Sequence, residues 1–216
     1  MSRPHIVIAI DGPAASGKST VARALAKRLG FYFVNTGAMY RAVTWFVLKQ
    51  GIDPHDTAKV IELMDSRTFE AGLNGGNSTT LINGMDPTPH LSEPEVNQNV
   101  STIAGISEVR ELLVEKQRQY LNHNDLVMEG RDIGSVVFPE TPYKFYIDAS
   151  PEVRAQRRAR EGFRDEIVAR DRLDSSRKAS PLVISQDAFV IDSSDLGIEE
   201  VVQAVIDRLN LQGLTL

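Results

Sequence analysis

The chain has 216 residues, of which 42% are hydrophobic and 25% charged, a composition typical of one folded globular unit. It contains no cysteine, which excludes disulfides, thiolate metal centres and cysteine nucleophiles. The formal net charge of −5 argues against a general binder of nucleic-acid phosphates. The apolar run at residues 6–10 is too short for a signal peptide or a membrane span. We therefore expect a cytoplasmic protein, a monomer, that binds neither nucleic acid nor a membrane.

Strands and helices are predicted to alternate along the first quarter of the chain. Residues 6–10 form an apolar run typical of a buried parallel strand, and residues 19–29 then show helical spacing that ends at Gly30. A second short strand is predicted at residues 31–34 and a second helix at 39–49. This alternation predicts an α/β fold with a parallel sheet.

The pattern changes between about residues 66 and 90. Two segments of strand-forming residues, 68–71 and 79–82, flank the turn sequence Asn-Gly-Gly-Asn at 74–77, which predicts a β-hairpin inserted into the parallel fold. Helical spacing returns near Val96 and again from Ser107, a candidate N-cap. The insertion is therefore expected to span about residues 63–106.

The second half of the chain predicts the remaining strands and a charged segment. Strands are predicted at 125–129, 144–148 and 188–191, and an amphipathic helix at 198–211. Ser150 and Pro151 predict the start of a helix that enters an arginine-rich stretch. Charged helices are usually solvated faces, but phosphoryl transfer also needs mobile cations that exclude water. We expect one domain at 1–216, whose parts are a core of 1–62, 107–153 and 179–216, the insertion, and a lid at about 154–178.

The strongest motif is a phosphate-binding loop at residues 12–19. It reads Gly-Pro-Ala-Ala-Ser-Gly-Lys-Ser and fits the pattern G-x-x-x-x-G-K-[ST] between a predicted strand and a predicted helix. The glycines let backbone N–H groups face phosphate oxygens, Lys18 supplies a charge, and Ser19 offers a hydroxyl to Mg²⁺. The motif predicts ATP and Mg²⁺ as cofactors. The residues assigned to ATP here are Gly12, Pro13, Ala14, Ala15, Ser16, Gly17, Lys18, Ser19 and Thr20.

The phosphate loop occurs in several classes of protein. A nucleotide-switch GTPase should add D-x-x-G and N-K-x-D motifs, and neither occurs in the sequence. Mechanochemical ATPases and helicases are normally larger than this chain. The length favours a small-molecule kinase.

Two polar clusters follow predicted strands and should face the phosphate loop, because ligands of parallel sheets bind beyond the carboxyl ends of the strands. In the first cluster, Thr36 could bond a phosphate or cap a helix, and Arg41 could clamp a phosphate or lie on a solvated face. In the second cluster, Glu129 is positioned to orient Mg²⁺ through water, or to act only as a turn residue. The glycines around Arg131 and Asp132 predict a tight turn that presents both side chains.

Together these motifs resemble those of bacterial cytidylate kinases, which are P-loop nucleoside monophosphate kinases. The resemblance rests on residues 10–20, 35–41, 129–139 and the Arg-Asp-x-x-Asp-x-x-Arg pattern at 170–177, in the same order over essentially the whole chain. It implies a three-layer fold with a five-stranded parallel core sheet. It also implies that the hairpin belongs to an NMP-binding insertion and that the arginine-rich stretch forms a short helical lid.

The resemblance further implies roles for individual residues. The CMP site would consist of Thr36, Tyr40, Arg41, Ser101, Arg110, Arg131, Asp132, Asp174 and Arg177. Within it, Thr36, Arg41 and Arg131 would meet the CMP phosphate, Ser101, Arg110 and Asp132 would read the cytosine, and Asp174 would hold the ribose. Lid-hinge arginines near ATP would be Arg154, Arg157 and Arg158. The catalytic set would be Lys18, Arg131, Asp132, Arg170 and Arg177. Asn35 stands where many members have aspartate.

The chemistry of the base supports this reading of the acceptor. Cytosine offers an amino donor and a ring acceptor and uracil reverses them, so an acidic acceptor paired with an arginine can distinguish the two bases. The expected reaction moves the ATP γ-phosphoryl group to CMP or dCMP. The alternatives are another small P-loop kinase acting on UMP, AMP or a shikimate-like acceptor, and a regulator that binds ATP without catalysis.

Overall fold

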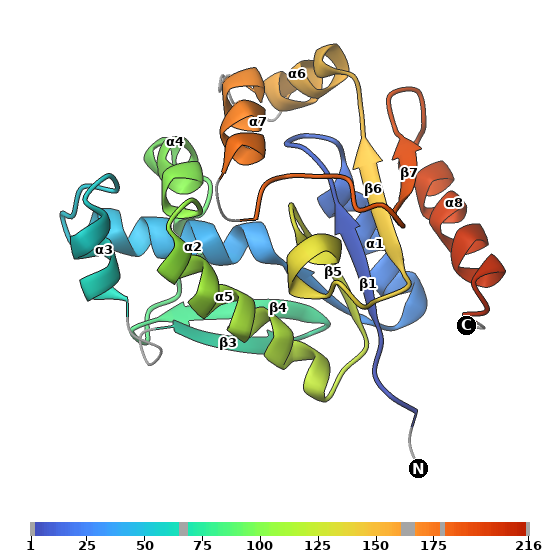
Figure 1. Ribbon diagram of the computed structural model, residues 1–216, viewed down its shortest axis with the longest axis horizontal. Helices are drawn as coiled ribbons and strands as arrows, with labels where there is room; N and C mark the ends of the chain where they lie inside the picture. Colours follow the sequence, from blue (N-terminus) through green and yellow to red (C-terminus); the bar gives the residue numbers. More distant parts are fainter. Residues whose placement is uncertain (1–2, 65–68, 161–166, 178–179, 215–216) are drawn as a thin grey trace.

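The structure is a computed structural model that describes residues 3–64, 69–160, 167–177 and 180–214, without the side chains of residues 167, 168 and 170. Its centre is a seven-stranded sheet in the order β3-β4-β2-β5-β1-β6-β7 (Figure 1). Five neighbouring strands are parallel: β2 (Tyr32–Asn35), β5 (Leu126–Gly130), β1 (Val7–Asp11), β6 (Lys144–Asp148) and β7 (Phe189–Asp192). The predicted five-stranded parallel core is confirmed.

The hairpin widens this sheet by two strands, which the sequence did not predict. Its strands are β3 (Phe69–Asn74) and β4 (Asn77–Ile82), antiparallel to each other. The tip of the hairpin reaches the edge of β2, where the Phe33 N–H donates to the carbonyl of Gly76 at 2.9 Å. The predicted hairpin is present, but it continues the sheet because β2 would otherwise be an unpaired edge.

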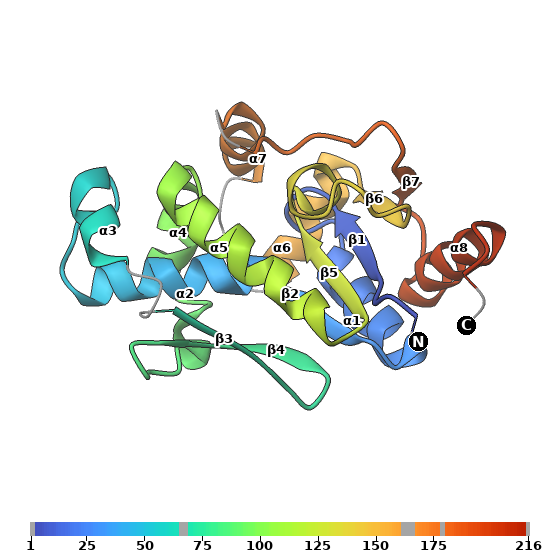
Figure 2. The same cartoon turned by 60° about the horizontal axis from the view of Figure 1, so that its bottom comes forward.

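Helices cover both faces of the sheet and give the three layers (Figure 2). On one face lie α1 (Lys18–Leu29) and α8 (Ile198–Leu211), and on the other lie α2 (Thr36–Lys49), α4 (Pro94–Ile103) and α5 (Ser107–Gln119). Alternate residues of β1 supply the two cores: Ile8 and Ile10 pack with α1 and α8, and Val7 and Ala9 with the opposite layer. The remaining helical elements are α3 (Thr57–Leu63), η1 (Thr88–His90), η2 (Tyr120–Asn122), the π-helix η3 (Ile133–Val137), α6 (Pro151–Arg160) and α7 (Ile167–Ser176).

Helix starts show which capping predictions were right. Ser150 caps α6, because its hydroxyl accepts the Val153 N–H at 3.3 Å. Ser107 is not an N-cap: it is the first residue of α5, Ile106 holds the capping position, and no side chain caps this helix. The cap of α2 is Asn35, whose Oδ1 accepts the Ala38 N–H at 3.0 Å. Thr36 therefore does not cap α2.

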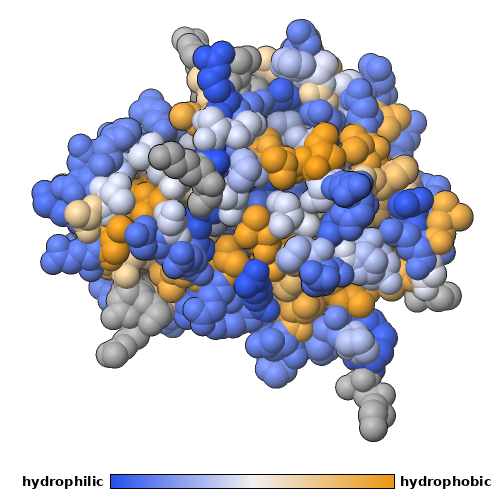
Figure 3. Space-filling model, in the orientation of Figure 1, coloured by the Kyte–Doolittle hydropathy of each residue, from blue (hydrophilic) through white to orange (hydrophobic). Residues whose placement is uncertain are grey.

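Residues 180–188 lead into β7 and cross in front of β6 in the view of Figure 1. Leu182 is buried and its N–H donates to the carbonyl of Asp174 at 2.9 Å, whereas Val183 and Ile184 are exposed. Figure 3 shows apolar side chains gathered on the face that this segment crosses. No helix within the described part of the chain is both long and apolar enough to cross a lipid bilayer.

Candidate active site

A polar cleft of about 470 Å³ opens at the carboxyl ends of β1, β2 and β5. It is lined by the phosphate loop and the start of α1, by α2, α4 and the turn after β5, and by side chains from α5, α6 and α7. The cleft therefore brings together segments from both polar clusters and from the lid. Of the predicted site residues, the cleft is lined by Ala14, Ala15, Gly17, Lys18, Ser19, Thr20, Thr36, Tyr40, Arg41, Ser101, Arg110, Glu129, Arg131, Asp132, Arg158, Asp174 and Arg177.

The phosphate loop adopts a conformation that depends on its glycines. Gly17 has φ 89°, in the left-handed region that favours glycine, and it directly precedes α1. At Gly12 a Cβ atom would collide with the carbonyl oxygen of Ile147 in β6. The ammonium of Lys18 folds back over the loop and donates to the carbonyl of Pro13 at 2.9 Å. A bound phosphate oxygen could replace the Pro13 carbonyl as the acceptor of the Lys18 ammonium.

Oxygen ligands suited to Mg²⁺ meet at the start of α1. The Ser19 hydroxyl donates to Glu129 Oε1 at 2.7 Å, so these two side chains lie together although 110 residues separate them in the sequence. Mg²⁺ prefers oxygen ligands and usually takes one or two from protein, the rest coming from phosphates and water. The described residues contain no group of three or more acidic or histidine side chains that could hold a metal ion. Ser19 and Glu129 fit a Mg²⁺ ion carried by ATP.

Arginines concentrate on the side of the cleft that α2 and the turn after β5 form, which we call the acceptor side after its predicted role. Arg41 donates to Asn97 Oδ1 at 3.4 Å, and Arg158 from the lid approaches the same oxygen at 3.5 Å. Burial, followed by the charge of Arg131, lowers the pKa of Arg41 to about 10, and Arg158 adds to the effect. Like charges held this close favour a bound anion, because an anion relieves their repulsion. The cluster suits a phosphate dianion.

Behind this cluster lies a buried ion pair between Arg110 of α5 and Asp132 of the turn after β5. Both side chains are about 95% buried, with relative exposures of 4% and 5%. Arg110 also donates to the carbonyl of Ala104 at 3.1 Å, and its guanidinium lies 5.3 Å from the centre of the Tyr40 ring. The pair forms a fixed donor and acceptor in the cleft, and Tyr40 supports it as a cation–π platform.

A second junction is built around Asp174 of α7. Its carboxylate accepts from Arg131 Nε at 2.9 Å, from the Ser101 hydroxyl at 3.1 Å, and from Arg177. The turn after β5, helix α4 and the lid therefore meet at one carboxylate that is almost fully buried. Thr36 is committed in a similar way: its hydroxyl donates to the carbonyl of Glu129 at 2.9 Å.

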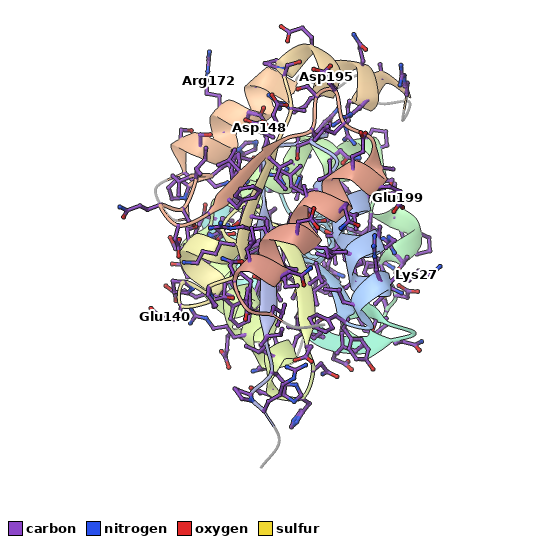
Figure 4. The ribbon with its side chains drawn as sticks, turned by 90° about the vertical axis from the view of Figure 1, so that its right-hand side faces the viewer. Lys27, Glu140, Asp148, Arg172, Asp195 and Glu199 are labelled. Carbon is purple, nitrogen blue, oxygen red and sulfur yellow. The ribbon has the colours of Figure 1, made fainter. Side chains whose placement is uncertain are left out.

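The lid arginines divide into two groups. Arg158 lines the cleft, whereas Arg154 and Arg157 bond the loop from behind, donating to the carbonyls of Ala14 at 3.4 Å and Ser16 at 3.2 Å. Contact of Arg154 and Arg157 with ATP stays a prediction. Arg172 is exposed and points away from the molecule (Figure 4). Arg170 belongs to α7, but its side chain lies outside the described residues.

Three residues of the site were not predicted from the sequence. Asn97 accepts from Arg41 and Arg158, Asp171 pairs with Arg154, and Asp11 binds the turn after β5. Asp171 lies inside the motif at 170–177 and Asp11 inside the stretch at 10–20, whereas Asn97 belongs to no motif of the sequence. Gly12, Pro13 and Ser16 belong to the loop without lining the cleft.

The cleft combines a phosphate loop, a paired hydroxyl and carboxylate that suit a divalent metal ion, and a cluster of arginines, a combination typical of P-loop kinases. Comparison with known families identifies the particular kinase family, because residues 8–211 match the family model described as cytidylate kinase. The chain belongs to the cytidylate kinase family.

Relatives and solved structures agree with this membership. The chain is 46% identical to the cytidylate kinase of Clostridium botulinum strain Hall, over 93% of this chain and 95% of that protein. It is also 46% identical to the cytidylate kinase of Desulforamulus reducens, over 94% and 96% of the two chains. Shikimate kinase from Acinetobacter baumannii, solved with shikimate, is 16% identical, with a TM-score of 0.50 over 98% of this chain and 96% of that one. The last likeness concerns the fold alone.

Proposed function

We propose that this chain transfers the γ-phosphoryl group of ATP to CMP or dCMP and releases ADP and CDP or dCDP. The observation that carries the proposal is the buried Arg110–Asp132 pair, which lies in one cleft with the phosphate loop and the arginine cluster. An arginine donor beside a carboxylate acceptor complements the ring acceptor and the amino group of cytosine. Uracil would leave these buried groups unsatisfied, which costs more than a difference in shape.

Transfer would proceed by in-line attack of an acceptor phosphate oxygen on the γ-phosphorus. The new oxygen–phosphorus bond forms as the bond to the bridging oxygen breaks, and ADP leaves with that electron pair. No general base is required, because phosphate monoesters lose their second proton with a pKa of about 6. In this scheme Lys18 stabilises the negative charge that develops on the γ-phosphate in the transition state, and Arg41 and Arg131 hold the acceptor phosphate. Bound Mg²⁺, held by ATP with Ser19 and Glu129, would neutralise phosphate charge.

The lid and the insertion have a role in this scheme. Asp174 joins the lid to Arg131 and Ser101, and Arg158 reaches the cleft from α6. Closure of α6 and α7 over the cleft would exclude water, which would otherwise hydrolyse ATP. Asp174 would then exchange part of its protein contacts for the ribose hydroxyls. We expect the protein to act as a monomer in the cytoplasm.

An acceptor screen tests the function. ADP release is measured with CMP, dCMP, UMP, AMP and shikimate offered singly with ATP and Mg²⁺. Release that depends on CMP or dCMP supports the proposal, and ³¹P NMR should then show the product as a diphosphate. Release only with UMP, AMP or shikimate assigns a different acceptor, and release with none indicates an ATP-binding regulator.

A further inference from the structure

Asp11 is a buried carboxylate that the reaction scheme does not use. It is the last residue of β1, directly before the phosphate loop, and only 5% of its surface is exposed. Its two oxygens accept two successive backbone donors: Oδ1 takes the Ile133 N–H and Oδ2 the Gly134 N–H, each at 2.8 Å. These N–H groups open the π-helix η3, where Asp132 holds the capping position without a side-chain cap bond. Asp11 therefore caps η3 although it belongs to β1, whereas η3 follows β5.

The turn that Asp11 holds also carries the predicted acceptor residues. Arg131 and Asp132 lie between Gly130, which ends β5, and the two amides that Asp11 binds. The turn has little room to adjust, because a Cβ at Gly130 would collide with Thr36 and with Ile133. On its other side Gly134 packs against Lys144 of β6. A shift at residues 133 and 134 would therefore move Arg131 and Asp132.

The pKa of Asp11 shows that burying its carboxyl group is costly, which suggests that the group is needed for the two hydrogen bonds that it accepts. Burial, the largest effect, raises the pKa of Asp11 to about 7, while the N–H groups of Gly134 and Ile133 oppose the rise. Asp132 adds to the rise and Arg131 opposes it, so Asp11 is coupled to both side chains of the turn. An apolar residue would avoid this cost of burial but would leave two buried amides without an acceptor.

We propose that Asp11 is a positioning residue for the acceptor side of the site. Its carboxylate accepts the N–H groups of Ile133 and Gly134 at the start of η3. These two bonds align Asp132 and Arg131 relative to the phosphate loop, which begins at the residue after Asp11. The expected effect of Asp11 on catalysis rests on the proposed function. The structural half of the proposal, that Asp11 fixes the turn, can be measured without any turnover.

The test compares Asp11→Asn with Asp125→Asn. The asparagine at position 11 keeps the size but directs an amide N–H₂ at one of the two backbone donors. Asp125 is the matched control: its carboxylate also accepts a backbone N–H, that of Ile6 at 2.9 Å, beside the beginning of β1. Amide hydrogen exchange at Ile133 and Gly134 is followed by NMR, and steady-state kinetics give KM for CMP and for ATP.

For Asp11→Asn we expect faster exchange at both amides and a rise of roughly tenfold or more in KM for CMP, because misplacing substrate-positioning groups by about 1 Å can cost on the order of 100-fold. KM for ATP should change by less than about twofold, and Asp125→Asn should change neither KM. Unchanged exchange at Ile133 and Gly134 would overturn the positioning role. Equal rises in both KM values, or faster exchange with an unchanged KM for CMP, would overturn the link to the acceptor. A wild-type protein without CMP-dependent ADP release would refute the proposed function and that link together, while the exchange data would still show whether Asp11 holds the turn.

Discussion

The two sides of the cleft hold their charged groups in different ways. On the phosphate-loop side, Lys18 and Arg157 donate to neutral backbone carbonyls of Pro13 and Ser16, and only Arg154 among the described arginines that bond this loop also pairs with a carboxylate, that of Asp171. On the acceptor side, arginines meet carboxylates, as in Arg110–Asp132 and Arg131–Asp174. Carbonyls compete weakly with phosphate for a cation, whereas a buried ion pair is costly to break and keeps its geometry. Under the proposed function, Lys18 on the loop side would meet phosphate charge, and the buried Arg110–Asp132 pair would read the base.

The largest effect should come from the loop side. In Lys18→Ala the cation that follows the developing γ-phosphate charge is lost, so kcat should fall by a factor on the order of 10³. The control is Lys27→Ala, because Lys27 lies on the same helix but is exposed (Figure 4). Both variants are assayed with saturating ATP and CMP. Equal kcat values for the two variants would contradict a catalytic role for Lys18.

On the acceptor side, Asp132→Ala should affect CMP far more than ATP. The variant removes an acceptor for the base and leaves Arg110 buried without its carboxylate, so KM for CMP should rise roughly 10- to 100-fold. The unfolding free energy should also drop, by about 3 kcal/mol, because a buried charge loses its partner. ATP affinity, measured by calorimetry, should stay within about twofold of wild type. Equal losses of CMP and ATP binding would refute base reading by Asp132.

The lid should show a smaller effect that separates its arginines. Arg158 lines the cleft and Arg172 points away from it. Arg158→Ala should lower kcat roughly tenfold, because a cation that closes over phosphate is lost, whereas Arg172→Ala should stay within about twofold of wild type. If both substitutions lower kcat alike, the effect of the lid is general charge and not the position of Arg158.

The last prediction concerns the pH dependence of stability and leaves the chemistry of the cleft aside. Because burial raises the pKa of Asp11 to about 7, the folded protein binds more protons than the unfolded chain between about pH 4 and 7. The contribution of Asp11 to stability is therefore greatest at the acid end of that window and is lost as the pH rises through 7. Relative to Asp11→Asn, the wild-type unfolding free energy should fall by up to about 1.4 kcal/mol per pH unit. Urea unfolding at several pH values would detect this, and a difference that does not vary with pH would contradict it.

The sequence predicted features that are encoded locally. The phosphate loop could be identified because its glycines, Lys18 and Ser19 are contiguous, and the parallel strands because each is a short apolar run. The hairpin itself was predicted from its turn, but its pairing with β2 was not, since that pairing depends on contacts between distant residues, such as Phe33 with Gly76 and Asn35 with Ser78. Local patterns do not specify which edge a hairpin joins.

Contacts between distant segments explain most of what the sequence could not predict. Asp11 and Gly134 are separated by 123 residues, and no spacing rule connects them. Asn97 lies in an ordinary helix and acquires its role only because Arg41 and Arg158 converge on it. The family resemblance assigned Arg110 and Asp132 to the same base, but neither it nor residue spacing predicted that the two side chains form an ion pair.

Base reading by Arg110 and Asp132 is tested most directly by the ratio of kcat/KM for CMP to kcat/KM for UMP, determined side by side in wild type and in Asp132→Ala. If the Arg110–Asp132 pair reads the base, the ratio should be well above one in wild type and should fall toward one in the variant. An identical ratio in the two proteins would contradict base reading by this pair.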